Sequence, residues 1–320
     1  MKFIDFFAGI GGFRRGLEMA GHECVGFCEW DKYATASYTA MHLATPDQRA
    51  FIETLPKKER TKEILKSEYK NGEWYADDVR SVNGGNCPKA DIFCFGAPCQ
   101  DFSIAGVRCG VGGNRSSLVA EIFRIVGEQE DKPEWLIYEN VVGMLSSNSG
   151  WDYFAIISEM DRLGYDVEWR IFNSKDYGVP QNRERVYTIG HFRKNGRCEV
   201  LPEIAPIGEN SIPIIQIGQH DTKTRKNSNV LRVYDSDGLA PTIATMQGGN
   251  RQPCVLDRGR VRKLTPRECF RLQGWSDEYF DRAALINSDA QLYKQAGNGV
   301  TVNVVYEIGK RIAEIERRYS

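Results

Sequence analysis

The stretch KFIDFFAGIGGFRRGLEMA, residues 2–20, indicates the fold of the chain. Its apolar start has the length of a buried strand, glycines follow at once, and an amphipathic pattern then predicts a helix that runs to about Ala20. Later apolar runs have the same length and alternate with helical patterns; they are residues 22–30, 90–96, 134–140, 166–172 and 185–190. Strands that alternate with helices predict an α/β fold with a mostly parallel sheet covered on both faces.

The composition of the chain changes after about His191. The following residues are rich in Gly, Pro, Asn, Asp and Thr and carry only short runs typical of strands. Helical patterns then return, and residues 300–319 predict a terminal helix. We therefore expect a large domain at residues 1–190, completed by residues 276–320, and a smaller, irregular, β-rich domain with a basic linker at residues 191–275.

Two segments of the large domain carry further expectations. Residues 151–163 have apolar side chains at helical spacing, which predicts a helix that turns Trp151, Phe154, Ile157 and Met160 toward the core. Residues 46–74 are polar and highly charged, which predicts a surface insertion with one helix.

The composition limits the class of protein. The chain has 320 residues, of which 41% are hydrophobic and 27% charged, as in ordinary globular proteins. No apolar run approaches the roughly 20 residues of a membrane span, and Asp5 and the glycines break the N-terminal run, unlike a signal peptide. Nine cysteines without a CxxC pair predict reduced thiols and no metal site. We expect a cytoplasmic monomer with no membrane partner.

Basic residues gather in one part of a chain whose net charge is only −1. Residues 211–263 contain nine basic and four acidic side chains, so this segment has a net charge of +5. A solvated loop surface and a phosphate-binding surface are both compatible with this pattern.

Three glycines, Gly9, Gly11 and Gly12, lie between the first strand and the first helix. Glycine there permits a tight turn and a close approach of the backbone to a ligand. The dinucleotide fingerprint G-x-G-x-x-G is incomplete because its third position is Arg14. Glu29 lies at the end of the second strand, where an acid can bind both ribose hydroxyls. The turn predicts a ligand with adenosine but no pyrophosphate, such as S-adenosylmethionine, although glycine turns without a ligand are common.

A cysteine, a carboxyl group and two guanidinium groups are expected to meet at one edge of the sheet. Cys99 follows the strand-like run DIFCF, at the edge where open α/β sheets bind ligands. The next strand ends in Glu139, and the segment QNRERV places Arg183 and Arg185 on one face of a further strand. No histidine accompanies the cysteine in this segment.

This set of groups is suited to a methyl transfer onto a pyrimidine. Cytosine becomes electrophilic at carbon 6 when N3 is protonated, which a buried, neutral Glu139 can do, and an arginine on O2 stabilises the developing charge. Attack by Cys99 then makes carbon 5 nucleophilic enough to accept a methyl group from a sulfonium donor. Nearby positive charge favours the thiolate, so a dedicated histidine base is not needed.

Seven segments, in chain order, resemble the motifs of DNA cytosine-5 methyltransferases of the bacterial and phage modification type. They are DFFAGIGGF, CEWDKYA, GAPCQDFSIAG, ENVVGML, QNRERVYTIG, RKLTPRECFRLQGW and QAGNGVTVNVV. The resemblance implies a Rossmann-like, S-adenosylmethionine-dependent methyltransferase domain and a small target-recognition domain across a cleft. It also implies double-stranded DNA as the substrate and the cytoplasm of a bacterial or phage-infected cell as the location. A cognate restriction endonuclease can belong to the same system, but we expect no stable complex with it.

The resemblance implies a role for each matched residue. Cys99 resembles the nucleophile, Glu139 the partner of cytosine N3, and Arg185 the arginine that holds O2, with Arg183 supporting it. The residues at cofactor-binding positions are Phe7, Gly9, Ile10, Gly11, Gly12, Glu29, Trp30, Asp78, Val79, Pro98, Asn298 and Val300. Ala97 departs from the family's phenylalanine, which implies a roomier cofactor pocket.

The target base must leave the duplex because carbons 5 and 6 of a stacked cytosine are not accessible from both faces. We expect residues 191–263 and the loop of residues 100–117 to hold the opened DNA at one short specific sequence. The candidate DNA contacts are Gln100, Ser103 and Arg115 in this loop, Arg232 and Tyr234 as base readers, and Thr242 and Ile243 in the segment that resembles the family's recognition core. Phosphate contacts or scaffold roles remain open for each of these residues.

Three other functions compete with DNA methylation. A tRNA cytosine methyltransferase shares most of the motifs, but the chain lacks that branch's Cys-Phe-Thr signature. The incomplete glycine fingerprint argues against an NAD-dependent oxidoreductase. A non-catalytic DNA-binding relative is expected to have lost Cys99 or Glu139, and both are present.

Overall fold

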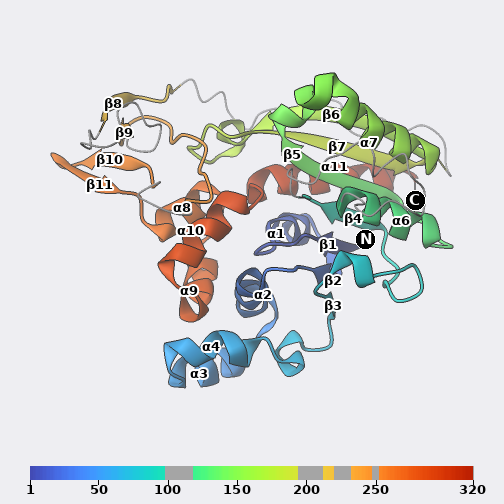
Figure 1. The fold of residues 1–320 in the computed structure, drawn as a ribbon, viewed down its shortest axis with the longest axis horizontal. Coiled ribbons are helices and arrows are strands. Elements are labelled where there is room, and N and C mark those ends of the chain that lie inside the picture. The colour runs from blue at the N-terminus through green and yellow to red at the C-terminus, as the bar shows by residue number, and fades with distance from the viewer. Residues whose placement is uncertain (98–117, 194–211, 220–231, 247–251, 320) are drawn as a thin grey trace.

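The computed structural model describes residues 1–97, 118–193, 212–219, 232–246 and 252–319 (Figure 1). Seven strands form the main sheet in the order β3-β2-β1-β4-β5-β7-β6. These strands are β1 Lys2–Phe6, β2 Glu23–Cys28, β3 Trp74–Ala76, β4 Ile92–Phe95, β5 Trp135–Val141, β6 Tyr165–Asn173 and β7 Glu184–Phe192. All strands predicted for this sheet are present, and β3 is an additional short strand at its edge.

The main sheet is mostly parallel, as predicted. Strands β1 to β5 run parallel to one another, whereas β7 is antiparallel to both β5 and β6. Parallel strands place their carboxyl ends at one edge of the sheet. The antiparallel β7 brings its first residues to that same edge, because Val141 at the end of β5 pairs with Arg185 near the start of β7.

Helices cover both faces of the main sheet (Figure 1). Helices α6 (Leu118–Glu128) and α7 (Trp151–Arg162) pack on the face that carries Ile4 and Phe6 of β1. Helices α1 (Gly12–Met19) and α11 (Val302–Tyr319) pack on the face that carries Phe3. Because successive side chains of a strand point to opposite faces, the buried residues of β1 serve both layers. The terminal helix therefore completes the core that the first residues begin.

The predicted helix at 151–163 is present as α7, but two of the four side chains predicted to face the core are exposed. Trp151 and Phe154 are 55% and 59% exposed, and their rings contact each other edge to face. Met160 is fully buried and Ile157 packs against the core, as predicted, and Tyr153 and Ile156 complete the buried face. Two apolar stripes share this short helix, and periodicity alone does not say which of them meets the sheet.

The charged segment 46–74 holds two α-helices rather than the one predicted. Helices α3 (Pro46–Thr54) and α4 (Lys57–Ile64) are followed by a 3₁₀ turn at Ser67–Lys70. Their few apolar side chains, among them Ile52 and Ile64, are fully buried in a small cluster that includes Ile286 of the C-terminal part. The insertion therefore packs against a part of the chain more than 200 residues away. Helices that each bury only one or two residues carry little hydrophobic periodicity. The sequence pattern therefore predicted one helix where two are present.

The remaining helices follow β2 or belong to the C-terminal part of the chain. They are α2 (Lys32–Tyr38), the π-helix η1 (Thr39–Leu43), α8 (Pro266–Leu272), α9 (Asp277–Ile286) and α10 (Asp289–Asn298). Short 3₁₀ helices lie at Val79–Ser81, Val142–Gly150 and Ser174–Tyr177. Helix α8 begins with a capping box between Thr265 and Glu268, with Pro266 at its first position. Among the described residues, no helix has the length and apolar character needed to cross a membrane.

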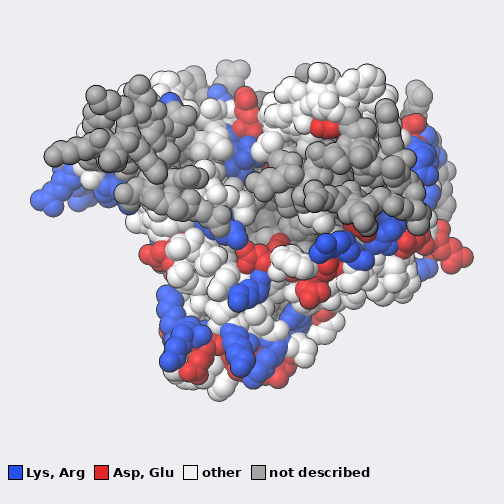
Figure 2. Space-filling model, in the orientation of Figure 1, with Lys and Arg blue, Asp and Glu red and all other residues white. Residues whose placement is uncertain are grey.

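A second, four-stranded sheet lies apart from the main sheet, with the order β11-β10-β9-β8 (Figure 1). Its strands are β8 Gln216–Gln219, β9 Arg232–Asp235, β10 Cys254–Asp257 and β11 Arg260–Lys263. In the space-filling view, Lys and Arg side chains gather at its outer end, on the left of Figure 2. The small β-rich unit that composition predicted is thus present.

Candidate active site

A cavity of about 1310 Å³ lies at the carboxyl edge of the main sheet. Residues that follow β1, β2, β3 and β4 line one side of it, together with the end of β5 and the start of β7. Helix α10 and Thr245 line the other side. Open α/β sheets bind their ligands at this edge because the strand ends and the loops that follow them are the least encumbered by packing.

The cavity brings together residues from both predicted sites. The lining residues that the sequence predicted are Phe7, Gly9, Glu29, Trp30, Asp78, Val79, Glu139, Arg183, Arg185 and Asn298. Four others do not line it: Ile10, Gly11, Gly12 and Val300. A side chain on Gly12 would meet Val300. Pro98, Cys99, Gln100, Ser103 and Arg115 lie outside the described residues. Ala97, the last described residue before them, lines the cavity and is buried.

The glycine turn after β1 is held in a conformation that suits glycine. Gly9 and Gly11 have φ angles of 57° and 84°, in the left-handed region. The backbone N–H of Gly11 donates to the carbonyl of Ala8 at 2.7 Å, and Gly11 is the N-cap of α1. A Cβ on Gly9 would have no atom within 4 Å, so this side of the turn opens on the cavity.

Glu29 is fixed by the backbone on both sides. Its Oε2 accepts a hydrogen bond from the N–H of Gly9 at 2.7 Å, and its Oε1 accepts one from the N–H of Asp31 at 2.6 Å. Burial raises the pKa of Glu29, while these two backbone hydrogen bonds oppose the shift because they favour the charged form. The carboxylate is thus held at the rim of the turn, in place for a ligand with hydroxyl groups.

His42 supports the turn from behind. Its Nε2 lies 2.9 Å from the carbonyl oxygen of Ile10, so this nitrogen carries the hydrogen and donates it. A Cβ on Gly11 would lie 2.5 Å from the same Nε2, which shows how closely the ring is packed on the turn. Burial holds the pKa of His42 well below its usual range, so the ring is neutral. Sequence patterns gave no sign of this residue, because a π-helix has no simple periodicity.

The outer wall of the cavity carries an exposed aromatic ring. Trp30 is 70% exposed, and the guanidinium of Arg80 lies 5.4 Å from its ring centroid. Arg80 is also paired with Asp78 at 2.8 Å, which lowers the pKa of Asp78. A large aromatic face left open to a cavity is suited to stack against a planar ring.

Helix α10 contributes residues that the sequence analysis missed. Lys294 pairs with Asp31 at 2.6 Å, and Gln295 donates to the carbonyl of Tyr33 at 3.0 Å. Asp31 also caps α2 through its hydrogen bond with the N–H of Tyr33. The position of Asp31, directly before a helix, is a recognisable capping signal. No sequence signal predicts the pairing with Lys294, because 263 residues separate the two.

Glu139 lies on the inner side of the cavity in contact with Arg185. Its Oε1 is 3.2 Å from Nε of Arg185, and both side chains are mostly buried. Burial raises the pKa of Glu139, and the guanidinium groups of Arg185 and Arg183 oppose this shift. A Cβ on Gly96 would come within 3.3 Å of Oε2, so glycine at this position leaves room for the carboxyl group. The structure thus places Glu139 in contact with Arg185.

Arg183 joins three segments of the chain beneath the cavity. It is 2% exposed, and its guanidinium donates to the carbonyl oxygens of Gly299 at 2.9 Å, Gly297 at 3.3 Å and Ile243 at 3.3 Å. Burial lowers its pKa to about 10, so it stays charged at neutral pH. Its hydrogen bonds are therefore mainly structural, and they hold β7, the end of α10 and the segment at Ile243 together.

The residues predicted to touch DNA occupy different environments. Arg232 and Tyr234 lie on β9 and are half-buried. The hydroxyl of Thr242 donates to the carbonyl of Asn182 at 2.7 Å. Ile243 is 1% exposed and packs in an apolar cluster with α8, α9 and α10, so in this structure its side chain supports the core rather than a surface.

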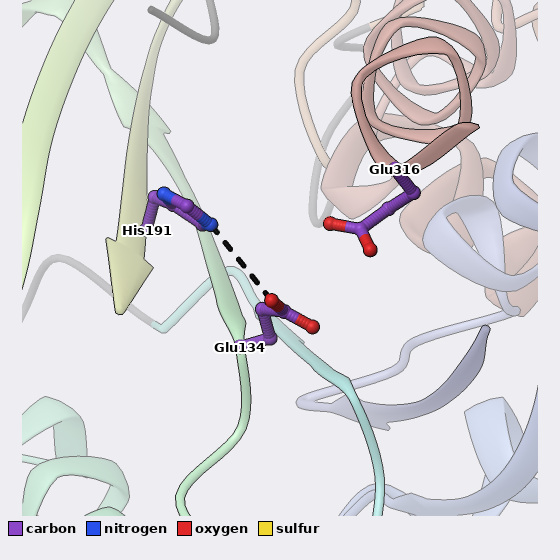
Figure 3. A group of neighbouring side chains, drawn as sticks. All are labelled: Glu134, His191 and Glu316. Atoms are coloured by element: carbon purple, nitrogen blue, oxygen red, sulfur yellow. Dashed lines mark ion pairs between the residues drawn. The ribbon is translucent and has the colours of Figure 1, made fainter. Parts of the chain in front are cut away.

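A second group of ionisable side chains lies away from the cavity, where β5 and β7 meet the terminal helix (Figure 3). Glu134, His191 and Glu316 each point a ligand-type atom toward the others, all within 4.8 Å. His191 stacks on Trp135, whose Nε1 donates to Glu316 at 3.0 Å. Burial lowers the pKa of His191, so its 4.0 Å approach to Glu134 is not a charged pair at neutral pH. The group connects α11 to the sheet.

The chain matches known sequences along almost its whole length. A family model described as C-5 cytosine-specific DNA methylase matches residues 1–54, 48–231 and 205–314. The type II methyltransferase M.HhaI of Haemophilus parahaemolyticus is 32% identical over 98% of this chain and 94% of its own. The type II methyltransferase M.HpaII of Haemophilus parainfluenzae is also 32% identical, over 98% of this chain and 89% of its own.

Solved structures show the same fold at lower sequence identity. The Dnmt2 methyltransferase of S. pombe covers 100% of this chain and 99% of its own with a TM-score of 0.69 and 14% identity. A putative DNA modification methyltransferase encoded within a prophage of E. coli covers 99% of both chains with a TM-score of 0.66 and 19% identity. The expected methyltransferase fold, with a large mostly parallel sheet and a smaller second sheet, is confirmed.

Proposed function

The chain belongs to the C-5 cytosine-specific DNA methylases and is a DNA cytosine-5 methyltransferase, and on this premise we propose how its cavity carries out the reaction. The cavity holds S-adenosylmethionine beside a cytosine that has been flipped out of a short specific sequence in double-stranded DNA. The observation that carries this proposal is the junction of two sets of groups in one cavity. The glycine turn with Glu29 lies on one side, and Glu139 with Arg185 lies on the other.

The described residues fit the adenosine part of the cofactor. The carboxylate of Glu29, fixed by two backbone N–H groups, is placed to accept hydrogen bonds from ribose hydroxyls. The open face of Trp30 is suited to a purine ring. The open side of Gly9 permits close contact with the backbone. When bound, S-adenosylmethionine supplies a methyl group activated by a sulfonium.

The pyrimidine reaction is assigned to the other side of the cavity. We assign attack on carbon 6 to the Cys99 thiolate, which forms a carbon–sulfur bond and moves an electron pair toward carbon 5. Glu139, whose pKa is raised by burial, donates a proton to N3. The protonated ring can then accommodate the displaced electron pair. Carbon 5 then takes the methyl group from the sulfonium and passes its proton to water. The electron pair of the C5–H bond re-forms the 5,6 double bond, the thiolate leaves carbon 6, and N3 returns its proton to Glu139. The role of Cys99 rests on its sequence motif, and Cys99 follows the end of β4 by four residues in the sequence.

The two arginines have different proposed roles. Arg185, in contact with Glu139 and exposed to the cavity, is assigned to cytosine O2, where a guanidinium stabilises the negative charge that develops during attack. Arg183 is assigned to positioning, because its guanidinium is already occupied by three carbonyl oxygens. It keeps β7 and therefore Arg185 in place.

The small sheet is assigned to target recognition. We propose that residues 1–190 with 276–320 form the catalytic and cofactor-binding domain, and that residues 191–275 read the DNA. The shared core of Ile243 with α8, α9 and α10 supports a fixed connection between the two parts. Arg232 and Tyr234, on the central strand β9, are the proposed base readers.

Methyl transfer from labelled S-adenosylmethionine to unmethylated genomic DNA, followed by bisulfite sequencing, tests the proposal. We expect 5-methylcytosine in one short motif with the wild-type protein and none with Cys99→Ser. Calorimetry with S-adenosylmethionine on both proteins controls for misfolding, since the variant should keep its cofactor affinity. Modification of tRNA with no modification of DNA would contradict the proposed substrate.

A further inference from the structure

The hairpin that joins β10 to β11 has an unusual residue at its tip. Asp257 pairs with Arg260, so the loop between the strands has only two residues, Arg258 and Gly259. Their φ angles are 49° and 76°, which identifies a type I′ turn. The first position of this turn favours Asn, Asp or Gly, because larger L-residues are strained in the left-handed region. Arg258 therefore occupies the position against the preference of the backbone.

The tip also concentrates positive charge on the surface. Arg258, Arg260 and Lys263 are all exposed. Their hairpin lies on the left of Figure 1, and Figure 2 shows a group of basic side chains on the same side. Neither Arg258 nor Arg260 forms an ion pair with any residue in the part of the chain that the structure describes. Arg262, two residues after Arg260, differs: it pairs with Asp257 at 2.9 Å and with Glu268 at 2.8 Å. One arginine thus braces the hairpin, and two project their charge into solvent.

The hairpin shares a sheet with the proposed base readers. Strand β10 runs beside β9, with Val255 opposite Tyr234. Arg258 lies three residues beyond Val255, and strands rise about 3.3 Å per residue with about 4.8 Å between neighbours. The backbone of the tip is therefore on the order of 10 Å from that of Tyr234. Phosphates close to a base read by β9 lie within reach of long arginine side chains at this distance.

We propose that Arg258 and Arg260 at this tip bind backbone phosphates of the duplex next to the target base, an inference that rests on the proposed function. A strained non-glycine residue kept at a surface turn points to a use for its side chain. Arginine is well suited to phosphate because its planar guanidinium offers several donors to the anion. The contact is independent of sequence and fixes the position of the small sheet on the duplex.

The dependence of DNA affinity on salt measures the number of such contacts. We would determine Kd by fluorescence anisotropy on a duplex of mixed sequence, at several NaCl concentrations, for the wild-type protein and Arg258→Asn. Asparagine is preferred in this turn, so the variant should fold at least as stably, which urea unfolding checks. We expect the slope of log K against log[NaCl] to become shallower by about 1, and Kd at low salt to rise several-fold.

A matched control separates a phosphate contact from the loss of any positive charge. Lys57 on α4 is exposed and lies on a different lobe of the molecule (Figure 1), so Lys57→Gln should leave the slope unchanged. An unchanged slope for Arg258→Asn, or an equal change for both variants, would overturn the inference. Methyl transfer by the same wild-type preparation keeps the two proposals apart: activity with an unchanged slope rejects the tip contact alone, and inactivity rejects the proposed function.

Discussion

Gly11→Ala should mainly lower the stability of the protein, whereas Gly9→Ala should mainly weaken cofactor binding, although both glycines belong to the same turn. Both have positive φ, so either substitution brings the strain of an L-residue in the left-handed region, about 1–2 kcal/mol. Only Gly11→Ala adds a steric overlap, because its Cβ would meet Nε2 of His42 at 2.5 Å and Cε2 of Tyr38 at 3.0 Å. Overpacking of this kind costs about 1–3 kcal/mol.

The expected loss of unfolding free energy is therefore about 2–5 kcal/mol for Gly11→Ala and about 1–2 kcal/mol for Gly9→Ala. Binding should show the reverse order. The Cβ of Gly9→Ala would project into the cavity, where it competes with the cofactor, so we expect its Kd for S-adenosylmethionine to rise at least about tenfold, or about 1.4 kcal/mol.

Equilibrium urea unfolding and calorimetry with S-adenosylmethionine measure the two effects. A third measurement uses His42→Ala, which removes the ring that the new methyl group would meet. His42→Ala should lower the free energy of unfolding less in the Gly11→Ala protein than in the wild type, because it also relieves the overlap. The reasoning is refuted if Gly11→Ala is no less stable than Gly9→Ala, or if Gly9→Ala binds the cofactor as tightly as the wild type.

Three more predictions concern proton transfer, pH and capping. Glu139→Gln should lower the rate of methyl transfer about 10²–10⁴-fold with an unchanged cofactor Kd; a rate near wild type would exclude proton donation. Burial lowers the pKa of His42 and His191, so the unfolded chain binds protons more readily. Their contribution to stability is complete above about pH 6.5 and falls at lower pH, and His42→Gln should shrink the difference between urea midpoints at pH 7.5 and 5.5. Thr265→Ala should cost about 1 kcal/mol in urea unfolding, and Ser276→Ala, which removes no cap hydrogen bond, should cost less.

The elements whose sequence carries a strong pattern were predicted correctly. Strands such as β1 and β5 are buried on both faces, so their apolar runs are unmistakable. The glycine turn and the meeting of Glu139 with Arg185 followed from strand order, since parallel strands share one functional edge. Local chemistry and topology together were enough to predict these features.

Features that depend on contacts distant in sequence were missed. The prediction for α7 was wrong at Trp151 and Phe154, because these side chains are as apolar as the ones that are buried. The brace formed by His42 depends on a π-helix and on a carbonyl oxygen 32 residues away. The carbonyl partners of Arg183 lie 60 to 116 residues further along the chain. Such pairings arise only when the whole fold is assembled, so no local pattern encodes them.

The proposed reaction depends on a covalent bond between Cys99 and cytosine during methyl transfer. Fluorine at carbon 5 of the target base tests it most directly, because the fluorine cannot leave as a proton does and the thiolate is then not eliminated. Mass spectrometry of the protein with 5-fluorocytosine DNA and S-adenosylmethionine should show a stable adduct of one protein, one DNA strand and one methyl group, located by peptide mapping at Cys99 and missing in Cys99→Ser. Methylation of ordinary DNA without any such adduct, or an adduct at another residue, would contradict the account.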